Sequence, residues 1–159
     1  MLLALLLVPG YVVAPVLFAK SATAAEAGML AGHVFHLSNI GILLFAASLA
    51  FFWIRMRRPA SRSNRWRWLL LLGLVLLVAA NEFALAPLMA DLKLQMGPID
   101  DVAMDDPLRH RFGMFHGISA LLHLLATGMA GFLVALGVSS CASTGESDEL
   151  ADSMIKGSV

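Results

Sequence analysis

Four long apolar stretches constrain this chain more than any other feature. They cover about residues 2–19, 28–54, 68–90 and 112–138. A helix needs about 20 apolar residues to cross a bilayer, and only a helix or a closed barrel satisfies its own backbone there. Just 14% of the residues are charged, whereas soluble domains carry roughly 25%. The sequence therefore predicts an all-α fold, an integral membrane four-helix bundle that forms one domain over residues 1–138.

The first stretch has a competing interpretation as a signal peptide, because small residues follow it at Ser21-Ala-Thr-Ala-Ala25. Signal peptides begin with a basic segment, and none precedes this apolar run. We therefore expect a membrane-spanning helix that is kinked at Pro15, since prolines in membrane helices need neighbours to satisfy the freed carbonyl groups.

Charge predicts the orientation. Six arginines lie in the segment 55–67, between the second and third stretches. Loops rich in Arg and Lys stay in the cytoplasm, which puts both termini inside and the connections 20–27 and 91–111 outside, as in a bacterial inner-membrane protein. Residues 139–159 are rich in Ser, Asp and Glu and are predicted to form a disordered acidic cytoplasmic tail. Because topology explains the arginines, the expected partner is the lipid bilayer and not nucleic acid.

Reporter fusions test this orientation. A reporter that is active only in the cytoplasm should be active when fused at Ser61 and inactive when fused at Pro98, because these residues lie in connections on opposite sides of the membrane. An external reporter at Ser61 would reverse the whole topology.

Several polar side chains are expected at similar depth in the outer half of the membrane. Glu82 is the most informative, because a carboxylate inside a span is costly and marks a functional candidate. We expect its partners to be His123 and His116; a purely structural hydrogen bond between the third and fourth stretches is the alternative. The predicted outward-facing polar pocket consists of Glu82, His116, His123, Asn81, Ser119, His36 and Asn39.

The histidines also make candidate metal ligands: His33, His36 and His116. Met29, His33 and His36 share one helix face, and imidazole with thioether suits copper, whereas imidazole alone suits haem iron or zinc. A haem held between His36 and His116 is one hypothesis. Histidines that are only hydrogen-bonded to backbone or water are the alternative.

No catalytic motif is apparent. The chain has no Ser/His/Asp spacing, no phosphate-binding glycine loop and a single cysteine, so we expect no enzyme. The first functional hypothesis is a protein that binds or moves a small solute or metal ion; the second is a haem or copper protein. The third is a subunit of a homo-oligomer or membrane complex, because glycines on the fourth stretch permit close helix approach, namely Gly113, Gly117, Gly128 and Gly131.

The two halves of the chain match weakly. Val13-Ala-Pro-Val-Leu17 is similar to Leu85-Ala-Pro-Leu-Met89, and Val34-Phe-His36 is similar to Met114-Phe-His116, in the same order. The match raises the hypothesis of two parallel two-helix repeats, related by an axis along the membrane normal.

Four segments resemble a known family: Val12-Val-Ala-Pro-Val-Leu-Phe18, Glu26-Ala-Gly28, Asn81 with Pro87, and Arg111-Phe-Gly-Met-Phe-His-Gly-Ile-Ser119. The chain resembles the TMEM205-like membrane proteins, which carry the DUF4149 domain, from residue 12 to about 138. The resemblance implies a small four-helix membrane protein of poorly defined function, with some relatives linked to the handling of toxic compounds, including metal drugs.

Some of the candidate residues match the family pattern and others do not. His123 stands where the family more often has asparagine, and His33 and Glu82 are outside the pattern. A hydrogen-bonded polar layer fits this better than a bis-histidine haem. The matching positions are Pro15, Asn81, Pro87, Phe112, Gly113, His116, Gly117 and Ser119.

Overall fold

The computed structural model describes the backbone of residues 1–56 and 62–156, and the side chains of residues 1–56 and 65–137. Most of the chain in these ranges is helical, and none of it is a strand. The elements are α1 (Leu2–Leu7), the π-helix η1 (Val8–Val13), α2 (Ala14–Lys20), α3 (Ala24–Arg55), α4 (Arg62–Ala80), the π-helix η2 (Asn81–Leu85), α5 (Ala86–Met96), the 3-10 helix η3 (Ile99–Asp101) and α6 (Pro107–Lys156).

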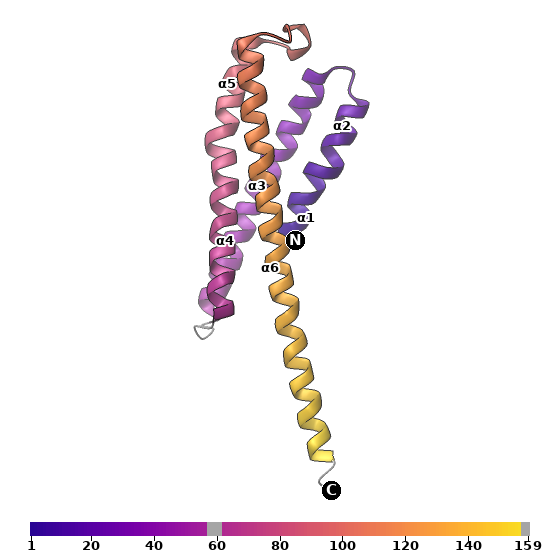
Figure 1. Ribbon diagram of the computed structural model, residues 1–159, viewed down its shortest axis with the longest axis vertical. Helices are drawn as coiled ribbons and strands as arrows, with labels where there is room; N and C mark the ends of the chain where they lie inside the picture. Colours follow the sequence, from indigo (N-terminus) through magenta and orange to yellow (C-terminus); the bar gives the residue numbers. More distant parts are fainter. Residues whose placement is uncertain (57–61, 157–159) are drawn as a thin grey trace.

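Four helices are long and apolar enough to cross a membrane: Leu2–Lys20, Ala24–Arg55, Arg65–Met96 and Pro107–Gly137. This confirms the predicted all-α membrane fold. Figure 1 shows the α2–α3 and α5–α6 connections at one end, and the C-terminal end of α3 with the N-terminal end of α4 at the other. The first span packs on α3 and α6, and the third span packs on the same two helices. The spans therefore form a ring in chain order.

The centre of the ring is a small apolar core to which every span contributes. Leu6, Ile42 and Leu74 are fully buried, and Ala126 and Ala130 supply the fourth span. These alanines bring α6 close to its neighbours within the bundle. A Cβ atom at Gly113, Gly117, Gly128 or Gly131 would meet nothing within 4 Å.

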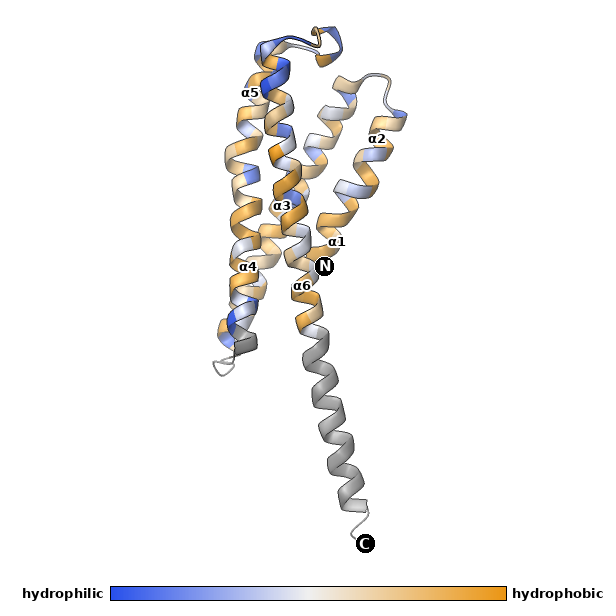
Figure 2. Cartoon of the chain, viewed as in Figure 1, coloured by the Kyte–Doolittle hydropathy of each residue, from blue (hydrophilic) through white to orange (hydrophobic). Residues whose placement is uncertain are grey.

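The outer surface of the bundle is apolar, as a lipid-facing surface must be. Leu37, Leu44 and Phe51 on α3 are among the large hydrophobic side chains that stay exposed. In Figure 2 the hydrophilic residues gather in the α5–α6 connection and at the far end of α4, with an apolar band between them. This distribution is typical of a protein with two wet ends and a lipid-facing middle.

The helices begin and end at other residues than the hydropathy pattern predicts, because local capping interactions fix their ends. α3 begins at Ala24, earlier than predicted, because Thr23 Oγ1 accepts a hydrogen bond from the Glu26 N–H at 3.1 Å. Asp100, in the α5–α6 connection, accepts hydrogen bonds from the N–H groups of Ala24 at 3.2 Å and Ala25 at 2.9 Å. The carboxylate thus ties the α5–α6 connection to the start of α3.

The polar α5–α6 connection is shorter than the predicted 91–111. α5 continues to Met96, and Gly97 ends it with a positive φ of 75°. α6 begins at Pro107, where Asp106 Oδ1 accepts a hydrogen bond from the Leu108 N–H at 2.7 Å. A hydropathy profile shows where lipid begins, whereas caps decide where the helix ends.

The backbone of α6 is helical to Lys156, although composition predicted a disordered tail from residue 139. No proline follows Pro107, and extending an existing helix costs far less than starting one. Side chains beyond residue 137 lie outside the described residues. The cytoplasmic location of this segment stays a prediction.

The first and third spans each contain a π-helical segment that ends immediately before an Ala-Pro pair. The Ala14 N–H bonds to the Pro9 carbonyl and the Ala86 N–H to the Asn81 carbonyl, both five residues back. The widened turn makes room for the following proline ring, which would collide with a carbonyl of a regular α-helix. The two segments fall at matching positions of the predicted repeat, which gives the sequence match a structural counterpart.

Candidate functional site

Three polar side chains are buried within the described ranges: Asn39, Asn81 and Glu82, at 4%, 9% and 7% exposure. Asn39 lies on α3, and the other two open the π-helical segment η2. π-helical segments inside α-helices occur frequently at functional sites. The buried polar groups are thus concentrated at one level of the bundle, where the third span widens.

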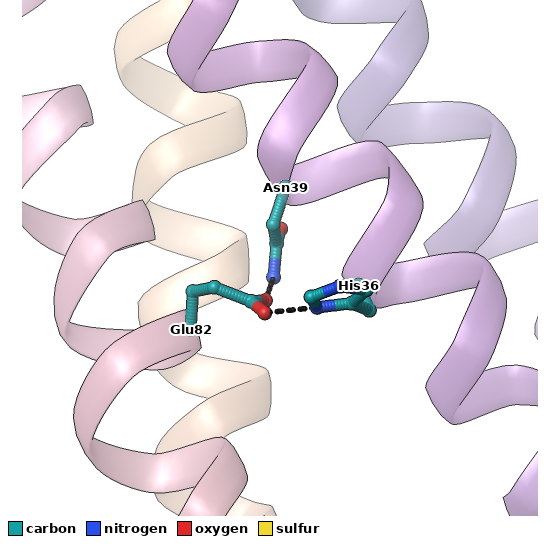
Figure 3. A network of polar contacts seen from close by, with 3 residues as sticks. All are labelled: His36, Asn39 and Glu82. Carbon is teal, nitrogen blue, oxygen red and sulfur yellow. Dashed lines mark hydrogen bonds and ion pairs between the residues drawn. The ribbon is translucent and has the colours of Figure 1, made fainter.

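Glu82 crosses from the third span to α3 and accepts two hydrogen bonds (Figure 3). Asn39 donates its amide Nδ2–H to Glu82 Oε2 at 2.9 Å, and His36 donates its Nδ1–H to Glu82 Oε1. His36 and Asn39 lie one turn apart on the same helix face. Both oxygens of the carboxylate are therefore satisfied within the membrane span.

The prediction that Glu82 contacts His116 and His123 on α6 was wrong. Neighbouring residues in a helix point in different directions, and Asn81 and Glu82 face different helices. Asn81 faces α6, where its Oδ1 accepts a hydrogen bond from the Ser119 hydroxyl at 2.6 Å. Glu82 faces α3 instead.

His123 makes a separate contact with the first span. Its Nε2–H donates to the Leu6 carbonyl at 2.8 Å, and Phe35 packs edge-on against its ring, with centroids 5.3 Å apart. The ring occupies the space beside Gly10, where a Cβ atom would lie 2.8 Å from His123 Nε2. His123 is thus a packed link between α6 and α1.

His116 and His33 lie at the surface of the bundle. The His116 ring stacks on Phe112, with centroids 6.0 Å apart and planes at 11°. His33 donates its Nδ1–H to the Met29 carbonyl of its own helix at 2.9 Å. Within the described side chains, no three His, Cys, Asp or Glu residues are grouped as metal ligands.

The predicted pocket residues therefore divide among several contacts and do not converge on one cavity. A groove of about 340 Å³ does open between the first span and α3, but its lining is apolar except for Ser38. Glu82, His36 and Asn39 do not line it. The candidate site is this hydrogen-bonded cluster, which we call the Glu82 cluster.

Comparison with known proteins gives one match. The model of the family described as a domain of unknown function, DUF4149, matches residues 2–98, more than half of the chain. The chain belongs to the DUF4149 family. No curated protein and no solved structure matches it. The DUF4149 match contains the whole Glu82 cluster and Gly10, whereas His116, Ser119 and His123 lie beyond it.

The predicted internal repeat pairs the Glu82 cluster with a second set of residues in the described part of the chain. Pairing Val13 with Leu85 places Gly10 opposite Glu82, and pairing His36 with His116 places Asn39 opposite Ser119. The second half thus retains a histidine and a short polar residue, but the matching residue of the first span, Gly10, has no side chain. The His123 ring fills the space beside it.

Two residues that make contacts between the helices were not identified from the sequence. Gly10 was read only as an interruption of an apolar run, although the repeat alignment marks its position. Lys93 was left in the outer connection, but its amine lies 3.4 Å from the Gly28 carbonyl and 5.5 Å above the Phe112 ring centroid. No spacing signal identifies a lysine that joins three helices in this way.

Proposed function

We propose that this protein is a non-enzymatic integral membrane protein that binds or moves a small cationic solute, metal ions included, at the Glu82 cluster. One observation carries the proposal. Glu82 is a buried carboxylate inside a membrane span, and one of its two partners, His36, is 65% exposed through its side chain. The contact therefore reaches from the interior of the bundle to its surface.

The chemistry of the cluster favours a cation. An ionised carboxylate only accepts hydrogen bonds, and placing one in a membrane is costly unless a donor or a positive charge compensates for it. An anion brought to this site would meet the same carboxylate without compensation. A cation can share or replace the contact that His36 makes with Glu82.

A second candidate, a subunit of a homo-oligomer or membrane complex, is favoured by the position of His36. It lies about 18 Å along α3 from Ala24 at 1.5 Å per residue, next to Leu37, which is 75% exposed. A polar ring exposed at this depth would be covered if another chain packed there. The haem hypothesis gains no comparable support, because His36 contacts Glu82 and His116 stacks on Phe112.

The inner membrane and cytoplasmic termini remain part of the proposal. The segregation of charge along the sequence supports them: the arginine-rich segment 55–67 separates the second and third spans, and the aspartate-rich connection separates the third and fourth.

Growth of a bacterial host expressing the full chain tests the proposal. Inhibitory concentrations are measured for Zn²⁺, Cu²⁺, Ni²⁺ and the organic cation tetraphenylphosphonium. We expect the chain to change tolerance to at least one of them several-fold, and Glu82→Gln and His36→Ala to abolish that change. Asp91→Asn is the matched control, because Asp91 is an exposed carboxylate of the same span, bonded only to Gln95 within the described residues.

Two outcomes would overturn the proposal. One is that the wild-type chain alters no tolerance while accumulating in the membrane. The other is that Glu82→Gln behaves like the wild type. Purification of a defined partner chain together with the protein, lost on His36→Ala, would then establish the subunit candidate in its place.

A further inference from the structure

We infer that His33 and His36 present their Nε2 atoms as a two-imidazole binding site for a divalent transition-metal ion of the zinc, copper and nickel class. The inference rests on the function proposed above and narrows its solute to this class of cation. It uses a second atom of His36, on the opposite side of the ring from the contact with Glu82.

Both imidazoles are held through Nδ1. His36 donates its Nδ1–H to the Glu82 carboxylate, and His33 donates its Nδ1–H to the Met29 carbonyl at 2.9 Å. Histidines that bind metals almost always donate their other ring N–H to a carboxylate or a backbone carbonyl, which fixes the tautomer and raises the basicity of the ligand. Each neutral ring therefore carries its lone pair on Nε2.

Both Nε2 atoms are available. His33 and His36 are exposed, and within the described part of the chain neither Nε2 atom has a hydrogen-bond partner. The other span histidines differ. His123 uses its Nε2–H on the Leu6 carbonyl. The His116 ring stacks on Phe112, and among the described residues it has no hydrogen-bond acceptor.

The two rings lie three residues apart on α3, so they occupy neighbouring positions on one face of the helix. Met29, one turn before His33, is 55% exposed and offers a thioether on the same face. Imidazole ligands suit zinc, copper and nickel, whereas calcium and magnesium take oxygen ligands. Two protein ligands leave coordination positions open, as expected for an ion that is bound and passed on.

The buried charge of Glu82 makes such an ion tolerable at this depth. The carboxylate contacts His36 directly, so it offsets part of the charge of a metal ion on the far side of the same ring. The ion needs no carboxylate of its own, which explains how a two-histidine site can serve without a third His, Cys, Asp or Glu side chain beside it.

Equilibrium dialysis of the tag-free full chain in lipid nanodiscs, against ZnCl₂ and NiCl₂, tests the inference. Cys141→Ser is used as the background so that its thiol does not contribute. We expect one ion per chain, at least tenfold weaker binding for His33→Ala and for His36→Ala, and 10–100-fold weaker binding for Glu82→Gln through loss of the oriented imidazole. With Cu²⁺, electron paramagnetic resonance should show coupling to two nitrogen nuclei.

His116→Ala is the matched control, because it removes an exposed span histidine that has no orienting acceptor among the described residues; it should bind as the wild type does. Absence of binding to the wild type, or equal loss in His116→Ala and His36→Ala, would overturn the inference. His33→Gln removes the imidazole but keeps a polar side chain. If this variant loses binding while its circular dichroism remains that of the helical wild type, the loss does not come from unfolding. If dialysis shows no metal while Glu82-dependent tolerance to the organic cation persists, the metal site fails and the proposed function stands.

Discussion

Replacing Glu82 with alanine should lower the free energy of unfolding by about 2 kcal/mol. The change removes both hydrogen bonds and leaves the buried Asn39 amide without an acceptor, and an unsatisfied buried polar group costs about 1–3 kcal/mol. Hydrogen bonds within membrane proteins contribute about 0.6 kcal/mol on average and up to about 1.7 kcal/mol each. Unfolding of the purified protein by SDS titration in mixed micelles measures the change.

Two comparisons define the origin of this effect. Asp91→Ala removes an exposed carboxylate from the same span and should change stability by less than about 0.5 kcal/mol. A double-mutant cycle between Glu82→Ala and His36→Ala isolates their contact. A coupling energy near zero would show that the contact between the ring and the carboxylate contributes nothing to the folded state.

Replacing Gly10 with alanine should destabilise the protein by about 1–2 kcal/mol. The new Cβ atom would lie 2.8 Å from His123 Nε2 and 3.2 Å from His123 Cδ2. The ring is held there by the Leu6 carbonyl and by Phe35, so it cannot move without losing a hydrogen bond. Overpacking of this kind costs about 1–3 kcal/mol, offset in part by the higher helix propensity of alanine. The same SDS titration reports it.

Gly32→Ala is the matched control, because a Cβ atom there meets nothing within 4 Å; it should be neutral or stabilising by up to about 1 kcal/mol. His123→Ala should remove the penalty when combined with Gly10→Ala. If Gly10→Ala remained costly in that background, the collision with the ring would not be its cause.

These two predictions concern matching positions of the internal repeat. In the third span the position carries Glu82, which contacts His36 on the neighbouring helix α3; in the first span it carries Gly10, beside which His123 packs. The first and third spans thus share a widened turn before Ala-Pro. In the third span this turn carries the buried contact of Glu82 with His36, and in the first span it carries the tight packing of Gly10 against His123.

The sequence by itself determined the membrane fold, its four spans and the DUF4149 membership, and it singled out Glu82 as a residue that needs a partner. These follow from local properties, since a long apolar run in lipid has to satisfy its own backbone and a carboxylate within it has to find a partner. The candidate residues His36, Asn39, Asn81 and Ser119 were also recognised from their polarity alone.

Only the tertiary structure decided which of these residues meet. A π-helical turn adds a residue to the helix and rotates everything beyond it by about 100°, so a period of 3.6 cannot predict which way Glu82 faces relative to the rest of its span. The partner of His123 is a backbone carbonyl, which no residue pattern announces. Glu82 contacts α3 and not α6. The packing of the spans fixes the rotation of each helix about its axis, and hydropathy does not.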